Sequence, residues 1–374
     1  MLPTNTRVHM DALEGEKTMR KQTLKGLAVG LVAVFALAAC GSSSSTSDTV
    51  AADTTVAADA PGTGMKIGLL YDITGRGDKS FNDAAAMGYD KAMAEFSGAT
   101  FTESAPTGDE DRPERLKTLI EAGNGLIVCV GFLWTKDCGE AAAAHPEISF
   151  AIIDDIIDSP NAASLLFSEE QGSYLVGYAA ALKSTSGKLG FIGGVRTDGI
   201  GKFEAGFKQG ALAANPSATI EVKYATEPPD FSGFNDPAKG KTIAAAMYKS
   251  GIDVIYHAAG GTGAGLFAAA MESGKAAGEI WAIGVDSDQY NSVAAENGQE
   301  YILTSMLKRV DVATYEAMKA YINGAPLSGI NRYDVSTDGV GYSSANSAIA
   351  DVADKLEAVK ADIISGTVVV TDKP

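Results

Sequence analysis

The stretch Met65-Lys66-Ile67-Gly68-Leu69-Leu70-Tyr71, followed by Asp72, decides the fold class. It is a nearly continuous apolar run after a polar segment, which is typical of a strand buried on both faces. Residues 80–96 then carry apolar side chains at helical spacing, with Ser80 as the expected N-cap. A buried strand followed directly by a helix indicates a parallel α/β sheet.

The same alternation of strand and helix continues down the chain. We expect further strands at 126–130, 150–153, 188–192, 220–224, 254–256 and 280–285. We expect helices at 136–144, 169–184, 199–214, 236–249, 262–273 and 310–322. The predicted fold class is therefore α/β, with two doubly wound parallel-sheet lobes joined by a hinge. The expected division is an N-terminal lobe of 65–184 plus about 306–374 and a C-terminal lobe of 185–305, with crossings at Lys183 to Lys188 and again near Thr304 to Lys308.

Charge and composition exclude several classes of function. The 374 residues contain 30 Lys and Arg against 47 Asp and Glu, a net charge of -17, so the chain would repel nucleic acid. Three histidines without metal-ligand spacing predict no metal site, and no Walker lysine follows the glycine-rich stretch Gly260 to Gly265. We expect no cofactor. For Cys129 and Cys138 we expect two buried thiols, although a disulfide is chemically allowed in an exported chain.

The first forty residues differ from the rest. Arg20, Lys21 and Lys25 precede the uncharged run 26–39, which predicts a secretory signal at 1–39, with Met19 as the expected true start. The signal contains five basic and three acidic residues, so the remainder has a net charge of -19. The string from Leu37 to Cys40 resembles the bacterial lipobox, which implies lipidation of Cys40. The alternative is an uncleaved signal anchor in which Cys40 is incidental, and the short apolar run disfavours it. Residues 40–64 then read as a flexible tether at the extracytoplasmic face of the cell membrane.

Residues that follow the strands are the candidates for binding. Ligands of open α/β sheets bind beyond the carboxyl ends of the strands. The segment 71–82 offers a carboxylate, a glycine-rich loop, and an aromatic side chain next to an amide, and the segments 231–234 and 284–289 repeat parts of this pattern. Helix capping and a solvated loop explain the first segment equally well.

The order of these motifs resembles one known family. Lys66-Ile67-Gly68-Leu69-Leu70 with Asp72 and Asp78-Lys79-Ser80-Phe81-Asn82 looks like the opening of the basic membrane protein family of lipoproteins, the purine nucleoside receptors of ABC importers. Further matches run in order through Val130 to Phe132, Phe150 to Asp154, Glu169 to Gly177, Gly190 to Gly194, Lys202 to Phe207, Asp236 to Gly240, His257 to Gly260, Gly284 to Asp286 and Thr304 to Lys308. The resemblance implies a periplasmic-binding-protein type 1-like fold, in which two lobes close over the ligand like a Venus flytrap.

The resemblance also implies the ligand-binding residues. They are Asp72, Phe81, Asn82, Asp137, Phe234, Gly260, Asp286 and Lys308. In the family, two rings matching Phe81 and Phe234 clamp the base, and carboxylates matching Asp72 and Asp286 hold the ribose hydroxyls. Stacking tolerates any base, so polar groups must select it.

The remaining positions have narrower implied roles. Asn82 would meet the base edge or the ribose, Gly260 would permit close backbone approach, and Lys308 would reach the sugar or an acidic partner. The family usually has an acidic residue at about position 136, where this chain has Lys136 followed by Asp137. Either Asp137 takes that place or the base selectivity differs. Asp154 is a further acidic candidate, and capping or hydrogen bonding between the lobes explains it equally well.

The resulting prediction is a lipid-anchored solute-binding protein and not an enzyme. It would capture a purine nucleoside of the adenosine, guanosine or inosine class as a monomer and deliver it to the permease and ATPase subunits of an ABC transporter. A receptor for a sugar or autoinducer, a signalling or adhesion lipoprotein, and a nucleoside-cleaving enzyme are the alternatives. An enzyme would need a positioned base, an activated water or a phosphate site.

Overall fold

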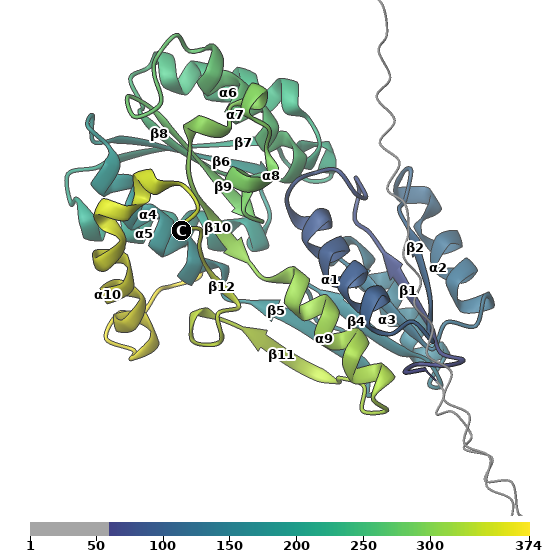
Figure 1. The fold of residues 1–374 in the computed structure, drawn as a ribbon. Coiled ribbons are helices and arrows are strands. Elements are labelled where there is room, and N and C mark those ends of the chain that lie inside the picture. The colour runs from purple at the N-terminus through teal and green to yellow at the C-terminus, as the bar shows by residue number, and fades with distance from the viewer. Residues whose placement is uncertain (1–59) are drawn as a thin grey trace, which may run out of the picture. The chain divides into compact units, whose positions relative to one another are not determined.

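Two six-stranded sheets organise residues 60–374, the part of the chain that this computed structural model describes (Figure 1). The predicted signal, Cys40 and most of the predicted tether lie outside the described residues. Among residues 60–374, none of the helices combines the length and the apolar character needed to cross a bilayer.

The first sheet is parallel throughout and has the order β11-β5-β4-β3-β1-β2. Its strands are β1 (Lys66–Leu70), β2 (Thr100–Ser104), β3 (Leu126–Val130), β4 (Ser149–Ile153), β5 (Ala162–Phe167) and β11 (Gly329–Tyr333). Helices α1 (Phe81–Glu95) and α9 (Val310–Ile322) pack against each other on one face, and α2 (Arg112–Glu121) and α3 (Thr135–Ala144) cover the other.

The second sheet has the order β12-β10-β9-β8-β6-β7 and is parallel except for β12. Its strands are β6 (Lys188–Val195), β7 (Thr219–Thr226), β8 (Val254–Ala258), β9 (Trp281–Asp286), β10 (Ile302–Lys308) and β12 (Val340–Tyr342). The helices around it are α4 (Glu169–Lys183), α5 (Asp198–Ala214), α6 (Pro237–Lys249), α7 (Ala264–Glu272), α8 (Gln289–Ser292) and α10 (Ala353–Ile364). Helices α4 and α5 pack together, as do α6 and α7, while α10 lies beside α4.

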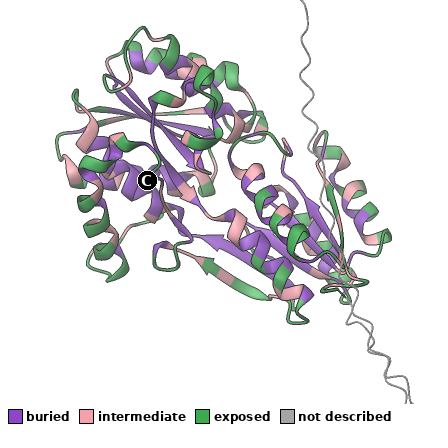
Figure 2. Cartoon of the chain, in the orientation of Figure 1, coloured by how far each residue is buried: buried purple, intermediate pink, exposed green. Residues whose placement is uncertain are grey.

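The buried strands explain why both faces of each sheet carry helices. Figure 2 shows the central strands as continuous buried ribbons between half-buried helices. In β1, Ile67 and Leu69 join the core beneath α1, whereas Leu70 points to the opposite face and joins the cluster beneath α2 and α3. Side chains alternate along a strand, so a continuous apolar run must be covered twice.

Every strand and helix expected from the sequence is present, with bounds that differ by a few residues. The pattern missed β2, α2, β5, α8, β11, β12 and α10, and it indicated β10 only as the second crossing near Thr304 to Lys308. Strand β2 shows the reason, because its sequence Thr-Phe-Thr-Glu-Ser is polar and mostly exposed at the sheet edge. An edge strand buries too little to leave an apolar run in the sequence.

The change of sheet comes earlier than the expected crossing at Lys183 to Lys188. Helix α4 already packs against α5, so the described chain leaves the first sheet between β5 and α4. The close approach depends on Gly206 and Gly210 of α5, where a Cβ would overlap with backbone carbonyl oxygens of α4. Near the C-terminus, β12 pairs with β10, so this part of the expected N-terminal lobe joins the second sheet. The spacing of apolar residues predicts a helix but does not indicate which of the two sheets that helix covers.

Cys129 and Cys138 form a disulfide with an S–S distance of 2.05 Å, so the expectation of two thiols was wrong. The bond joins the end of β3 to the first turns of α3. Between the two cysteines lies a tight turn in which Gly131 has a φ of 96°. The indole of Trp134 donates a hydrogen bond to the carbonyl oxygen of Tyr71 at 2.9 Å, which ties the same turn to the end of β1.

Candidate functional site

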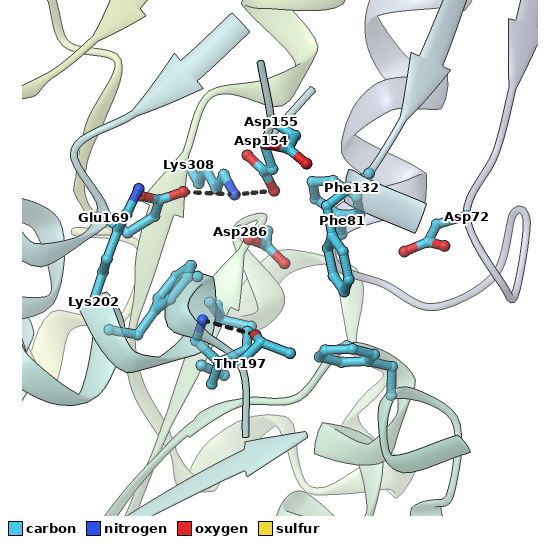
Figure 3. Close-up of a pocket in the computed structure, with 18 of the residues that line it drawn as sticks. Asp72, Phe81, Phe132, Asp154, Asp155, Glu169, Thr197, Lys202, Asp286 and Lys308 are labelled. Atoms are coloured by element: carbon cyan, nitrogen blue, oxygen red, sulfur yellow. Dashed lines mark hydrogen bonds and ion pairs between the residues drawn. The ribbon is translucent and has the colours of Figure 1, made fainter. Parts of the chain in front are cut away.

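A cavity of about 520 Å³ lies at the carboxyl ends of strands from both sheets (Figure 3). Small-molecule sites in proteins enclose roughly 300 to 1,000 Å³, so this volume suits a small ligand. The residues that directly follow β1, β3, β4 and β8 line it, together with the last residues of β9 and β10. This is where parallel sheets bind ligands.

Seven of the eight predicted binding residues line this cavity. They are Asp72, Phe81, Asn82, Phe234, Gly260, Asp286 and Lys308. Asp154, the further acidic candidate, lines it as well. The structure therefore brings together positions that are up to about 240 residues apart in the chain, and their role in binding stays a prediction.

Asp137 does not line the cavity. It lies in the first turn of α3 and lines a separate hollow between α2 and α3, next to Leu116 and Ile120. Its carboxylate is 3.9 Å from Nζ of Lys136. Lys136 does not line the cavity either, so neither of these two positions presents a side chain to a ligand there. The cavity instead receives Phe132 and Asp155 in this region.

Asp78 holds the glycine-rich loop after β1 against the start of α1. Its carboxylate accepts hydrogen bonds from the backbone N–H groups of Ser80, Asn82 and Asp83 at 2.9 to 3.0 Å. Ser80 occupies the N-cap position, as expected, but its side chain makes no capping bond. Capping therefore comes from Asp78, which leaves the Ser80 hydroxyl available for another partner.

The side chain of Asn82 ties this loop to Asp72. Its Oδ1 accepts from the backbone N–H of Asp72 at 2.9 Å, and its Nδ2 donates to Oγ1 of Thr74 and Oδ2 of Asp78, both at 3.0 Å. Both amide donors of Asn82 thus have acceptors within the protein. Only the second lone pair of its Oδ1 is left for a ligand donor.

Asp72 is a buried carboxylate at the end of β1. Its Oδ1 has no hydrogen-bond partner among residues 60–374 and lies 4.0 Å from Nη2 of Arg112. Burial is the main reason that its pKa rises to about 7, although the charge of Arg112 lowers it. A Cβ at Gly131 would lie 2.9 Å from Oδ2 of Asp72, so only glycine allows this approach.

Asp286 ends β9 with a φ of 63°, and Asp154 follows β4 with a φ of 71°. Left-handed backbone is uncommon for residues other than glycine, and such conformations concentrate at functional sites. Oδ2 of Asp286 accepts a hydrogen bond from the Ser80 hydroxyl at 2.5 Å. Burial, the largest cause, raises the pKa of Asp286 to about 7, while Lys308 lowers it.

Lys308 lies between two carboxylates from different elements, as Figure 3 shows. Its Nζ is 2.5 Å from Oδ2 of Asp154 and 3.0 Å from Oε1 of Glu169, and Lys202 holds the other oxygen of Glu169 at 3.1 Å. Burial disfavours the lysine charge, but the three nearby carboxylates outweigh it and raise the pKa of Lys308. Oδ1 of Asp154 has no hydrogen-bond partner among the described residues.

Aromatic rings enter the cavity from both sheets. Phe81 comes from α1 on the first sheet, and Phe234 comes from the short 3-10 helix Phe231–Phe234, which packs against β6 and β7 of the second. Gly194 of β6 makes room for Phe234, because a Cβ there would lie 2.5 Å from the ring. Phe132 also lines the cavity, and its ring packs edge-on against Phe231 with centroids 5.8 Å apart.

Several lining residues were not among the predicted binding residues. They include Thr74, Asp78, Phe132, Asp155, Glu169, Thr197, Asp198, Lys202, Phe203, Arg332 and Asp372. Glu169, Lys202 and Phe132 fall within stretches that matched the family, so that resemblance held a signal for them. Arg332 and Asp372 lie in the C-terminal part of the chain, where no local pattern indicated a site.

The chain is similar to solute-binding proteins of ABC transporters. The sequence model of the family described as "ABC transporter substrate-binding protein PnrA-like" matches residues 65–373. The "CD4+ T-cell-stimulating antigen" of Listeria monocytogenes is 37% identical over 374 residues, which cover 95% of this chain and 100% of the relative. The "ABC transporter nucleoside-binding protein BmpA" of Lactococcus lactis is 32% identical over 371 residues, with the same coverage of both chains.

Solved structures agree with these relatives. The crystal structure of a solute-binding protein of an ABC transporter system from Aeropyrum pernix superimposes with a TM-score of 0.71 at 28% identity, and covers 82% of this chain and 93% of that one. A second solute-binding protein, from Conexibacter woesei, gives a TM-score of 0.66 at 19% identity over 82% of this chain and 99% of that one, and supports the fold alone. The predicted family resemblance and the fold class of periplasmic-binding-protein type are thereby confirmed.

Proposed function

Because this chain belongs to the family of PnrA-like ABC transporter substrate-binding proteins, we propose that it captures a nucleoside in the cavity between its two sheets. The proposed ligand is a purine nucleoside of the adenosine, guanosine or inosine class. The protein would hold it as a monomer, without cofactor and without making or breaking a bond, and pass it to the permease and ATPase subunits of an ABC transporter. Lipidation of Cys40 would keep it at the extracytoplasmic face of the cell membrane.

The observation that carries this proposal is a pair of buried carboxylate oxygens beside the rings. Oδ1 of Asp72 and Oδ1 of Asp154 are buried and have no hydrogen-bond partner among the described residues. An unsatisfied buried acceptor costs about 1 to 3 kcal/mol, so a hydrogen-bond donor of the ligand that reaches one of these oxygens would remove that cost. A ribose offers several hydroxyl donors, and an ionised carboxylate accepts from them.

The rings supply the second part of the site. Phe81 and Phe234 line the same cavity from elements on different sheets, so a flat ligand between them would contact both halves of the protein. Stacking of a base on an aromatic ring contributes roughly 1 to 3 kcal/mol per base in nucleic-acid-binding proteins. We propose that these rings hold the base and that the acceptor Oδ1 of Asn82 contacts the base edge or the ribose.

Two further positions complete the proposed site. Gly260 has a φ of 54°, and a Cβ there would lie 3.1 Å from the carbonyl oxygen of Phe234, so glycine keeps this loop close to the ring. Lys308 would donate to the sugar while it neutralises Asp154. A carboxylate that faces a ligand is more easily kept ionised when a cation is next to it.

A panel of ligands tests the proposal. Purine and pyrimidine nucleosides, free bases and pentoses are titrated into the protein, and melting temperature and heat of binding are recorded. A ligand at a hundred times its Kd adds about 2.7 kcal/mol to the free energy of unfolding. Phe81→Leu and Phe234→Leu should each weaken nucleoside binding about tenfold or more. The control Phe101→Leu removes a ring that packs against Tyr89 outside the cavity and should bind as the wild type does.

The same panel, together with an assay for free base released from inosine, distinguishes the proposed function from the alternatives. Binding of pentoses without nucleosides would indicate a sugar receptor, and no response to any nucleoside would refute the proposed function. Release of free base from inosine at a catalytic rate would identify an enzyme instead.

A further inference from the structure

The C-terminal segment 367–374 reaches from the end of α10 to the cavity. Gln209 of α5 holds it with two hydrogen bonds, from Nε2 to the carbonyl oxygen of Thr371 at 2.8 Å and from the N–H of Thr371 to Oε1 at 3.0 Å. Val368 and Val370 pack against the main core. A side-chain amide that pairs with both backbone groups of one residue fixes the path of the segment at that point.

This path places Asp372 in the cavity lining. Thr197, Asp198 and Lys202, at the start of α5, line the same region. The negative charge of Asp372 is also close enough to Glu170 of α4 to raise the pKa of that carboxyl group. Burial is the main cause that raises the pKa of Glu170 to about 7, and the charges of Glu169 and Asp372 raise it further.

Asp372 adds a negative charge to a cavity in which carboxylates already outnumber cations. Eight carboxylates line it against three cations. Two of those cations, Lys202 and Lys308, are both engaged by Glu169, and the third is Arg332. Even when Asp72 and Asp286, whose pKa values are about 7, are half protonated, the ionised carboxylates of the cavity outnumber its cations. A ligand that carries its own negative charge is therefore repelled.

We propose that the segment 367–374 is a wall of the binding cavity and that Asp372 is a specificity-determining residue, which disfavours ligands that carry a phosphate. A neutral nucleoside would bind past this wall, while the same nucleoside with a 5′-phosphate would be repelled. This inference rests on the proposed nucleoside function and adds the basis for choosing nucleosides over nucleotides.

The test compares inosine, adenosine and guanosine with their 5′-monophosphates by calorimetry. The wild type should bind the nucleoside more tightly than its monophosphate. Asp372→Asn should raise the affinity for the monophosphate about threefold, the effect of one exposed charge, and leave the nucleoside affinity unchanged. The quantity compared is the ratio of the Kd for the monophosphate to the Kd for the nucleoside. The control Asp158→Asn removes an exposed carboxylate outside the cavity and should leave this ratio as in the wild type. Gln209→Ala, which releases the segment, should change the ratio in the same direction as Asp372→Asn.

The outcomes separate the two proposals. If the wild type binds no nucleoside, the proposed function fails. If it binds nucleosides but Asp372→Asn and Gln209→Ala both leave the ratio unchanged, only the role of this segment is refuted. A wild type that binds the monophosphate as tightly as the nucleoside would also overturn it.

Discussion

The Ser80 hydroxyl donates a hydrogen bond to Oδ2 of Asp286 at 2.5 Å and thereby joins the loop after β1 to the end of β9 in the other sheet. Two further hydrogen bonds join the same two segments. Oγ of Ser287 donates to the carbonyl oxygen of Ser80, and Nε2 of Gln289 donates to the carbonyl oxygen of Lys79, both at 3.0 Å. These contacts link the two halves of the cavity directly. They are the kind of contact that holds a two-lobed binding protein closed.

Loss of the Ser80 hydroxyl should weaken ligand binding. A hydrogen bond to a charged group contributes about 1.5 to 3 kcal/mol, so Ser80→Ala should raise the Kd for the ligand by about tenfold or more if this bond forms only in the closed protein. Isothermal titration with inosine measures the change. Ser217→Ala, at an exposed position just before β7, serves as the control. Equal affinities for both variants would show that the bond does not support closure.

Asp286 should make stability depend on pH in an unusual direction. Its pKa is about 7 in the folded chain, against an ordinary value of 3.8 that applies to the unfolded chain. Between these two pH values the folded state therefore keeps a proton that the unfolded state releases. Its contribution to stability is therefore present below about pH 4 and is lost as the pH rises to about 7. Asp286→Asn cannot ionise, so between pH 5 and pH 8 the unliganded variant should lose less stability than the wild type, by about 2 to 3 kcal/mol.

Urea denaturation at the two pH values measures this difference. Asp158→Asn, which removes an exposed carboxylate, should follow the wild type at both values. Parallel behaviour of Asp286→Asn and the wild type would contradict the raised pKa.

Removal of the buried lysine should be costly. Lys308→Met leaves Asp154 and Glu169 without their shared cation, and breaking a buried ion pair in this way costs about 3 to 5 kcal/mol. The matched control is Lys241→Met, which removes an exposed ion pair with Glu272 and should cost at most about 1 kcal/mol. Chemical denaturation compares the two. Similar losses would mean that the pair around Lys308 is as well solvated as a surface pair.

The disulfide should stabilise both the fold and the site. Replacing Cys129 and Cys138 by alanine together should lower the free energy of unfolding by about 2 to 4 kcal/mol. It should also weaken ligand binding, because the turn between them places Phe132 in the cavity. Melting temperature and calorimetry provide the two readouts. A reducing agent should lower the melting temperature of the wild type and leave the double variant unchanged, and an equal response of both would refute a stabilising bond.

The sequence was sufficient to predict the architecture and part of the candidate site. Buried strands leave continuous apolar runs, so β1, β3, β6 and β9 could be found without coordinates. The rule that ligands bind beyond the carboxyl ends of strands then pointed to Asp72 and Asp286, since both stand at such ends. These features depend only on residues that are neighbours in the sequence, so they can be recognised without coordinates.

Only the tertiary structure decided which side chains share the cavity. Asp137 lies outside the cavity, in the hollow between α2 and α3, and Asp372 enters the cavity lining because α5 holds the C-terminal segment through Gln209. Glu169 became part of the site because Lys308, far along the chain, lies 3.0 Å from it. Periodicity reports whether a residue is buried, whereas its partners depend on how distant elements pack, and that packing is not written in any one stretch of sequence.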